Sequence, residues 1–298
     1  MTYRLGTNLG FAANRFVEPE EWTRIVREEL GLNYVQFTAD LLNPFLPEDY
    51  IQTQLERIKD CVDLYDIKIE GIFTSTYTRV NHMMHPDAQA RDIWLDWFKK
   101  LLDIGAVLGA RNAGSHFGIL TVKTNETPER REYIIEEGIR GWQELSRYAS
   151  ELGYSELLFE PMSIPREMAY SIGATKELLE RVNSDSAIPI KLCLDIGHAP
   201  HPDDRDPYEW IKALASVSPI IHLQQTELHK SHHWPFTKKY NDIGIIDAKR
   251  VVETALESGL SDALFAFEIS HREHWDTDGL VVSDLKESVD YWRQYIEE

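Results

Sequence analysis

The chain has 298 residues, of which 43% are hydrophobic, so it can bury the core of one large domain or of two ordinary ones. Its formal net charge is −19 and it contains no basic block, which argues against nucleic acid or an anionic membrane as a partner. No apolar run approaches the length that spans a bilayer, and the N-terminus lacks the pattern of a signal peptide, so we expect a cytoplasmic protein.

Short apolar runs alternate with segments of helical periodicity along the whole chain. The runs that predict strands are, in order, residues 4–8, 34–37, 67–73, 110–113, 157–160, 190–195, 220–223 and 264–268. The segments that predict the following helices are residues 19–29, 48–65, 88–108, 128–152, 175–182, 207–214, 247–258 and 280–296. The fourth strand is the weakest of these predictions, and a long polar loop follows the seventh.

Strand and helix therefore alternate eight times, with no break in composition and no low-complexity linker. Eight consecutive βα units indicate an α/β fold, a single (β/α)₈ TIM barrel over residues 1–298, rather than a doubly wound sheet. No GxGxxG follows the first strand and no GxxxxGK[ST] occurs, which disfavours the nucleotide-binding folds.

The expected strands 5 to 8 each end on a residue that can hold a metal ion. These residues are Glu160, Asp195, His222 and Glu268. In TIM barrels the catalytic residues lie at the C-terminal ends of the strands, so these side chains should meet. Three carboxylates in one mouth would repel each other by roughly several kcal/mol at an effective dielectric of about 20 unless a cation lies among them. An oxygen-rich set with one imidazole suits one divalent ion, Mn²⁺, Mg²⁺ or Co²⁺, better than structural zinc, with catalytic Zn²⁺ as an alternative.

These residues resemble the metal-site pattern of the xylose isomerase-like barrels, and in particular of the ketose 3-epimerases of tagatose and psicose type. The most specific of the motifs is Asp-x-x-His after the sixth strand, from Asp195 to His198. At the level of the fold the resemblance covers the whole chain. Segments 159–167 and 233–237 are further similar to the branch that acts on erythrulose phosphate.

By this resemblance, Glu160, Asp195, His222 and Glu268 bind one metal ion, and the two glutamates also serve as the catalytic acid/base pair. The implied reaction is epimerisation at C3 of a small ketose or ketose phosphate, such as erythrulose phosphate, through a cis-enediolate. A metal ion would act as a Lewis acid on the ketose carbonyl. Proton exchange on both faces of the enediolate requires two bases on opposite sides.

Several further residues are expected to bind the substrate. His198 would bond a substrate oxygen or orient a metal ligand, and His116 would line the mouth or serve a structural role. Arg166 and Glu167 follow Glu160 closely, so they would either reach the substrate or begin a helix.

The stretch after the seventh strand departs from the free-sugar epimerases, which carry an arginine shortly after the corresponding histidine. Here Gln224 begins a stretch without arginine, and the loop continues through a basic cluster that includes Lys230 and Lys238. Loops after strands 7 and 8 are a usual phosphate position in TIM barrels, so this cluster would bind a substrate phosphate or be ordinary exposed surface. The expected partner is thus a small sugar or sugar phosphate.

Other functions remain open at this point. An aldose-ketose isomerase and an inosose-type dehydratase share the same superfamily. A metal-dependent DNA repair nuclease would need more histidines and a positive face, and a non-catalytic sugar-binding barrel would not need two opposed glutamates.

Trp22, Trp142 and Trp292 would provide aromatic surface for a homo-oligomer. The histidines at 82, 85, 201, 271 and 274 are expected on loop surfaces.

Overall fold

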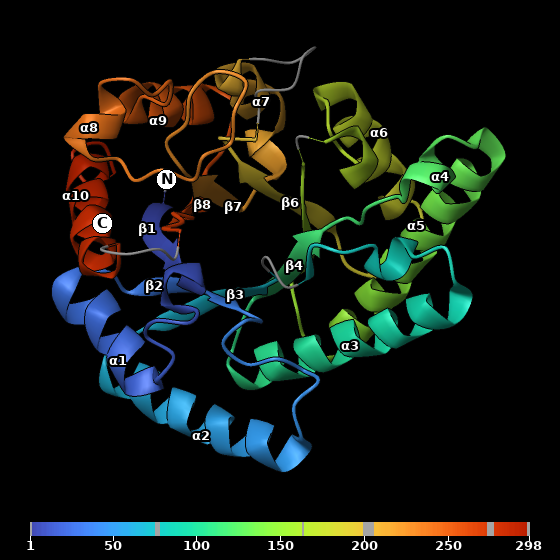
Figure 1. Ribbon diagram of the computed structural model, residues 1–298, viewed down its shortest axis with the longest axis horizontal. Coiled ribbons are helices and arrows are strands. Elements are labelled where there is room, and N and C mark those ends of the chain that lie inside the picture. The colour runs from blue at the N-terminus through green and yellow to red at the C-terminus, as the bar shows by residue number, and fades with distance from the viewer. Residues whose placement is uncertain (1, 75–77, 163, 199–205, 273–276, 297–298) are drawn as a thin grey trace.

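Eight parallel strands form a closed barrel, and neighbouring strands follow chain order all the way round (Figure 1). The computed structural model describes residues 2–74, 78–162, 164–198, 206–272 and 277–296. The strands are β1 (Thr2–Asn8), β2 (Tyr34–Thr38), β3 (Lys68–Phe73), β4 (Asn112–His116), β5 (Glu156–Glu160), β6 (Ile190–Asp195), β7 (Ile220–Leu223) and β8 (Asp262–Phe267). Pairing of β1 with β8, from Thr2↔Asp262 to Thr7↔Phe267, closes the barrel. The predicted (β/α)₈ fold is confirmed.

Helices surround the barrel, as Figure 1 shows. The main ones are α1 (Pro19–Arg24), α2 (Glu48–Leu64), α3 (Ala88–Val107), α5 (Pro128–Glu151), α6 (Ile172–Asn183), α7 (Pro207–Leu214), α9 (Ala248–Glu257) and α10 (Asp278–Trp292). Two short helices, α4 (Val122–Asn125) and α8 (Lys238–Asn241), were not predicted, because four residues are too few to show a helical period. Of the described helices, none is both long and apolar enough to cross a membrane.

Local signals in the sequence fix where these helices begin. The side chains of Asp87, Ser171, Asp206 and Asp247 each accept a hydrogen bond from a backbone N–H in the first turn of the helix that follows. Such caps satisfy N–H groups that have no partner inside the helix. Proline occupies the first position of α1, α5 and α7, where its missing N–H costs nothing.

The fourth strand runs over Asn112–His116, further along the chain than the predicted 110–113. Its residues have low strand propensity, so pairing with both neighbours decides its position. Gly114 pairs with Leu158 of β5, and a Cβ there would lie 2.3 Å from Phe73 Cε2. The glycine therefore allows β3, β4 and β5 to pack closely, and it places His116 beside Glu160 at the strand end.

The three tryptophans expected to form an aromatic surface lie in the core instead. Trp22, Trp142 and Trp292 are at most 2% exposed. Trp142 stacks on Phe117, and its indole N–H donates to the Phe117 carbonyl at 2.9 Å. The prediction of an oligomer surface from these residues was wrong, because each belongs to the buried face of its helix.

Candidate active site

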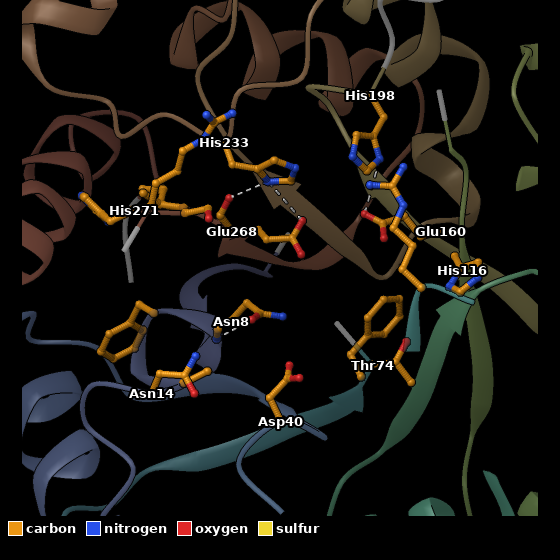
Figure 2. Close-up of a pocket in the computed structure, with 18 of the residues that line it drawn as sticks. Asn8, Asn14, Asp40, Thr74, His116, Glu160, His198, His233, Glu268 and His271 are labelled. Carbon is orange, nitrogen blue, oxygen red and sulfur yellow. Dashed lines mark hydrogen bonds and ion pairs between the residues drawn. The ribbon is translucent and has the colours of Figure 1, made fainter. Parts of the chain in front are cut away.

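A cavity of about 540 Å³ opens where the C-terminal ends of the strands meet. Figure 2 shows Glu160 below His198 and Glu268 below His233, on two sides of one space that Asn8, Asp40 and Thr74 face from below. The lining comes from the ends of β1, β3, β4 and β5 and from loops after β1, β2, β3, β5, β6, β7 and β8. The cavity is thus in the position where barrels of this kind place their catalytic groups.

Glu160, Asp195, His222 and Glu268 form a compact cluster, of which Glu160 and Glu268 line the cavity. Each offers one ligand atom, and these four atoms lie within 4.8 Å of one another. The first three are carried by β5, β6 and β7, and Glu268 directly follows β8. His222 Nδ1 lies 3.2 Å from Glu160 Oε1 and 3.0 Å from Glu268 Oε2.

The opposite nitrogen of His222 fixes the orientation of its ring. Nε2 lies 2.8 Å from Gln36 Oε1, which also accepts a hydrogen bond from Asn8 Nδ2. Because the Gln36 oxygen can only accept, Nε2 carries a proton and donates it. A neutral His222 therefore turns the lone pair of Nδ1 toward the two glutamates.

This donor set fits a divalent cation. Glu268 Oε2 is buried and accepts no hydrogen bond of normal geometry from the described residues, although His222 Nδ1 is nearby. Asp195 is oriented by two contacts, from Gln224 Nε2 at 2.8 Å and from the Gly197 N–H at 2.6 Å. Such outer contacts are what metal ligands commonly have.

The two glutamates have different electrostatic surroundings. Burial, together with the charge of Glu268, raises the pKa of Glu160. Burial would also raise the pKa of Glu268, but the His222 imidazolium lowers it below its ordinary value. Burial opposes charge on His222 as well, yet Cys193 and the carboxylates raise the pKa of His222 well above its usual range. Without a cation, a proton on His222 thus holds the cluster together.

Two histidines stand at the rim above these carboxylates. His198 Nδ1 lies 3.3 Å from the Pro161 carbonyl, and its Nε2 lies 3.7 Å from Asp195 Oδ2. His233 Nδ1 donates to the Glu268 carbonyl at 3.1 Å. Asp195, His198 and His233 also form a group whose ligand atoms lie within 4.8 Å of one another. Both histidines line the cavity, and His233 belongs to the basic cluster after β7 that was expected either to bind a substrate phosphate or to be exposed surface.

The structure brings some of the predicted substrate-binding residues to the cavity. His198 and His116 line it. Burial lowers the pKa of His116 to about 4, so His116 is neutral and donates from Nε2 to the Val80 carbonyl at 3.1 Å. Gln224 is fully buried outside the cavity lining, and its side-chain amide donates a hydrogen bond to Asp195.

The structure does not bring the other four to the cavity lining. Arg166 donates to the Leu120 carbonyl at 2.6 Å, and Glu167 is fully buried in an ion pair with Arg79. Lys230 pairs with Glu227 at 2.9 Å, and Lys238 begins the short helix α8. The loop after β7 therefore turns its lysines to the exterior, which differs from the expectation of a phosphate cluster there.

Sequence reasoning missed three cations that do line the cavity, Arg15, Arg79 and Arg272. They lie in loops after β1, β3 and β8, outside any periodic pattern. Position after a strand was the one available signal, and it is shared by many loop residues. His271, expected on the surface, also lines the cavity, and His82 is fully buried. The predictions for residues 201 and 274 fall outside the described residues.

Comparison with known proteins shows the family of the chain. The family described as Xylose isomerase-like TIM barrel matches residues 26–295. D-Erythrulose 1-phosphate 3-epimerase from Brucella abortus (strain 2308) is 33% identical over 302 residues, which covers 100% of this chain and 97% of the relative.

Solved structures give the same picture of the fold. A protein of Rhodospirillum rubrum ATCC 11170, provisionally named as a xylose isomerase, is 28% identical with a TM-score of 0.89, covering 98% of this chain and 99% of its own. D-Psicose 3-epimerase from Clostridium cellulolyticum H10, solved with D-tagatose, is 13% identical with a TM-score of 0.76. The match covers 99% of this chain and 100% of the epimerase chain. The chain belongs to the family of xylose isomerase-like TIM barrels, as an enzyme of the isomerase class.

Proposed function

We propose that this protein is a metal-dependent 3-epimerase of a small ketose phosphate, with erythrulose 1-phosphate as the first candidate substrate. The observation that carries the proposal is the position of Glu160 and Glu268. Glu160 is buried and Glu268 is half-buried, both approach His222 Nδ1, and both face the same cavity from β5 and from the end of β8. The name of the Brucella abortus relative supports the choice of substrate.

Inversion at C3 of a ketose needs one group to remove a proton and another to return one on the opposite face. In our proposal, one glutamate takes the C3 proton, and the electron pair of that bond enters a C2–C3 double bond as the carbonyl oxygen becomes an enediolate oxygen. The other glutamate then donates a proton to C3 from the other side. In our proposal, one carboxyl group is ionised and the other is protonated at the start.

The cluster Glu160, Asp195, His222 and Glu268 would hold one divalent cation, which would supply Lewis-acid stabilisation of the negative charge that develops on the substrate oxygens. Three carboxylates and one imidazole favour Mn²⁺, Mg²⁺ or Co²⁺, with Zn²⁺ as the alternative. His198 stands at the rim, where it would donate to a substrate oxygen. Gln224, Gly197 and Gln36 orient the ligands rather than the substrate.

The proposal can be tested by following the interconversion of D- and L-erythrulose 1-phosphate on a chiral column. The protein is depleted of metal and then reloaded with Mn²⁺, Mg²⁺, Co²⁺ or Zn²⁺. Glu160→Gln and Glu268→Gln should each lower kcat by at least roughly a thousandfold, because each removes a proton carrier that the other cannot replace. Glu56→Gln, on the exposed side of α2, is the matched control and should leave the rate unchanged.

Each rival function gives a different product. Formation of an aldose from free erythrulose, whose C1 hydroxyl group is not esterified, would identify an aldose-ketose isomerase, and loss of water from the substrate would identify a dehydratase. Retention of epimerase activity in Glu160→Gln or Glu268→Gln would contradict the assigned acid/base pair. Sugar binding without turnover in every metal form would favour a non-catalytic barrel.

A further inference from the structure

The side chain of Arg79 is held at the cavity by a carboxylate that is itself out of contact with solvent. Arg79 Nε donates to Glu167 Oε1 at 2.5 Å, and Nη2 donates to Oε2 at 2.7 Å. The side chain of Glu167 is 0% exposed, whereas that of Arg79 is 47% exposed and lines the cavity. A buried carboxylate without its partner would be strongly unfavourable, so the pair keeps Arg79 in one orientation.

This pairing uses one edge of the guanidinium group and leaves the other available. Glu167 takes the edge formed by Nε and Nη2, and no described residue accepts a hydrogen bond from Nη1. The second edge, formed by Nη1 and the remaining hydrogen of Nη2, can still donate two parallel hydrogen bonds. A phosphate group offers two oxygens at the spacing that such an edge binds.

The backbone that carries Arg79 is tied to neighbouring elements. The Val80 carbonyl accepts a hydrogen bond from His116 Nε2, and Asn81 Nδ2 donates to the Ile119 carbonyl at 2.6 Å. Thr78, on the other side, is fully buried. Arg79 is therefore positioned before any ligand arrives, which reduces the entropy lost on binding.

The charges around the cavity favour Arg79 over Arg15. Glu160, Glu268 and Asp40 line the space and would repel a phosphate dianion unless a cation faced it. Arg15 is 9% exposed and already donates to Asp278 at 2.7 Å and to the His271 carbonyl at 3.0 Å. Arg79 combines exposure with a fixed and open edge.

We propose that the open edge of Arg79 binds the phosphate of the ketose phosphate and that Glu167 is the residue that positions it. This inference rests on the proposed function for its substrate. It assigns the phosphate to the loop after β3 instead of the lysines after β7, and it gives Glu167 a role through Arg79 rather than in direct contact with the substrate.

The test compares erythrulose 1-phosphate with free erythrulose in steady-state kinetics. Arg79→Met should raise KM for the phosphorylated ketose about a hundredfold with little change in kcat, and should change kcat/KM for the free ketose less than threefold. Arg79→Lys keeps the charge but loses the two parallel N–H donors, so its KM should lie between that of the wild type and that of Arg79→Met. Arg147→Met removes an exposed arginine of α5 from its ion pair with Asp185, and it is the matched control.

Glu167→Gln tests the positioning role. It should raise KM for the phosphorylated ketose about tenfold, and it should leave kcat, and kcat/KM for the free ketose, unchanged. In the double variant with Arg79→Met, KM should be no higher than in Arg79→Met alone. Circular dichroism and thermal unfolding would confirm that each variant is folded. If the fold increase in KM of the double variant equalled the product of the two single increases, the role given to Glu167 would be contradicted.

A binding measurement separates this inference from the proposed function. Inorganic phosphate, titrated calorimetrically into the metal-loaded protein, should bind about tenfold more weakly to Arg79→Met than to the wild type. That result would support the subsite even if no ketose were epimerised. Equal losses for phosphorylated and free ketose would overturn the inference, as would a phosphate-specific loss in Arg272→Met with none in Arg79→Met.

Discussion

His222 contacts acidic groups through Nδ1 and an amide oxygen through Nε2, so it cannot satisfy all its partners while neutral unless a cation faces Nδ1. Because its pKa is raised well above the ordinary value, it carries a second proton when no metal is bound. A metal ion must displace that proton before it can coordinate Nδ1.

Metal affinity should therefore depend on pH. We expect the affinity for Mn²⁺ to rise with pH between 6 and 8, by up to about tenfold per pH unit for each proton released. Calorimetric titrations in two buffers of different ionisation enthalpy would count the protons. An affinity that is independent of pH, with no proton release, would contradict the described state of His222.

His116 predicts a second pH effect, on stability. Its folded-state pKa of about 4 lies below the ordinary 6.5, so between these values the unfolded chain binds a proton that the folded protein does not. Stability is therefore lost as the pH falls through this window, by about 3 kcal/mol at most for this residue. His116→Gln should reduce the difference in unfolding free energy between pH 7 and pH 4.5, measured in urea.

Exposed His229 provides the control for that measurement. His229→Gln should leave the pH dependence as in the wild type. If His116→Gln and the wild type lost the same stability on acidification, burial of a neutral imidazole at this position would be the wrong explanation.

At the scale of elements, the turn after β6 depends on close packing of a glycine. A Cβ at Gly197 would lie 2.2 Å from Gln224 Cδ, and the Gly197 N–H itself bonds Asp195. Gly197→Ala should thus push Gln224 away from Asp195, weaken metal binding at least about tenfold and cost roughly 1–3 kcal/mol of stability.

Gly173 in α6 is the matched comparison, because a Cβ there meets nothing within 4 Å. Gly173→Ala should leave metal binding unchanged and stabilise the helix by up to about 1 kcal/mol. Metal titration and urea unfolding of both variants would measure these changes in affinity and stability. Unchanged metal affinity in Gly197→Ala would show that Gln224 does not orient Asp195.

The elements also show what could be predicted from sequence. Glu160, Asp195, His222 and Glu268 could be brought together because each ends an apolar run, and parallel strands of a barrel end at one rim. The path of a loop has no such rule, so the lysines after β7 were expected near the substrate and lie outside the cavity lining. The pair formed by Arg79 and Glu167 joins residues 88 positions apart, which no local pattern reveals.

In the whole molecule, α10 completes the ring of helices around the barrel on the side where the chain begins. It lies beside the segment Ile25–Glu29 that continues α1 (Figure 1), and Arg293 donates to the Gly31 carbonyl. Trp292 is fully buried and packs on Phe236 and Phe265. Trp292, like Trp22 and Trp142, therefore packs in the core, and only the folded chain shows which face of its helix is covered.

Trp292→Ala should cost about 3–5 kcal/mol of unfolding free energy, because it leaves a large cavity in this seam. Trp94→Ala, which removes a half-buried ring on α3, should cost clearly less. Urea unfolding followed by circular dichroism measures both. Equal losses of unfolding free energy would mean that the packing of Trp292 stabilises the protein no more than the half-buried ring of Trp94 does.

In the proposed mechanism, Glu160 and Glu268 exchange protons at C3 of a ketose phosphate from opposite faces. The most direct test is NMR of erythrulose 1-phosphate incubated with metal-loaded protein in deuterium oxide. We predict that the epimerised product carries deuterium at C3, while substrate recovered early does not, since a second base supplies the new hydrogen. Deuterium at C1 alone, or exchange that persists in both Glu160→Gln and Glu268→Gln, would contradict this mechanism.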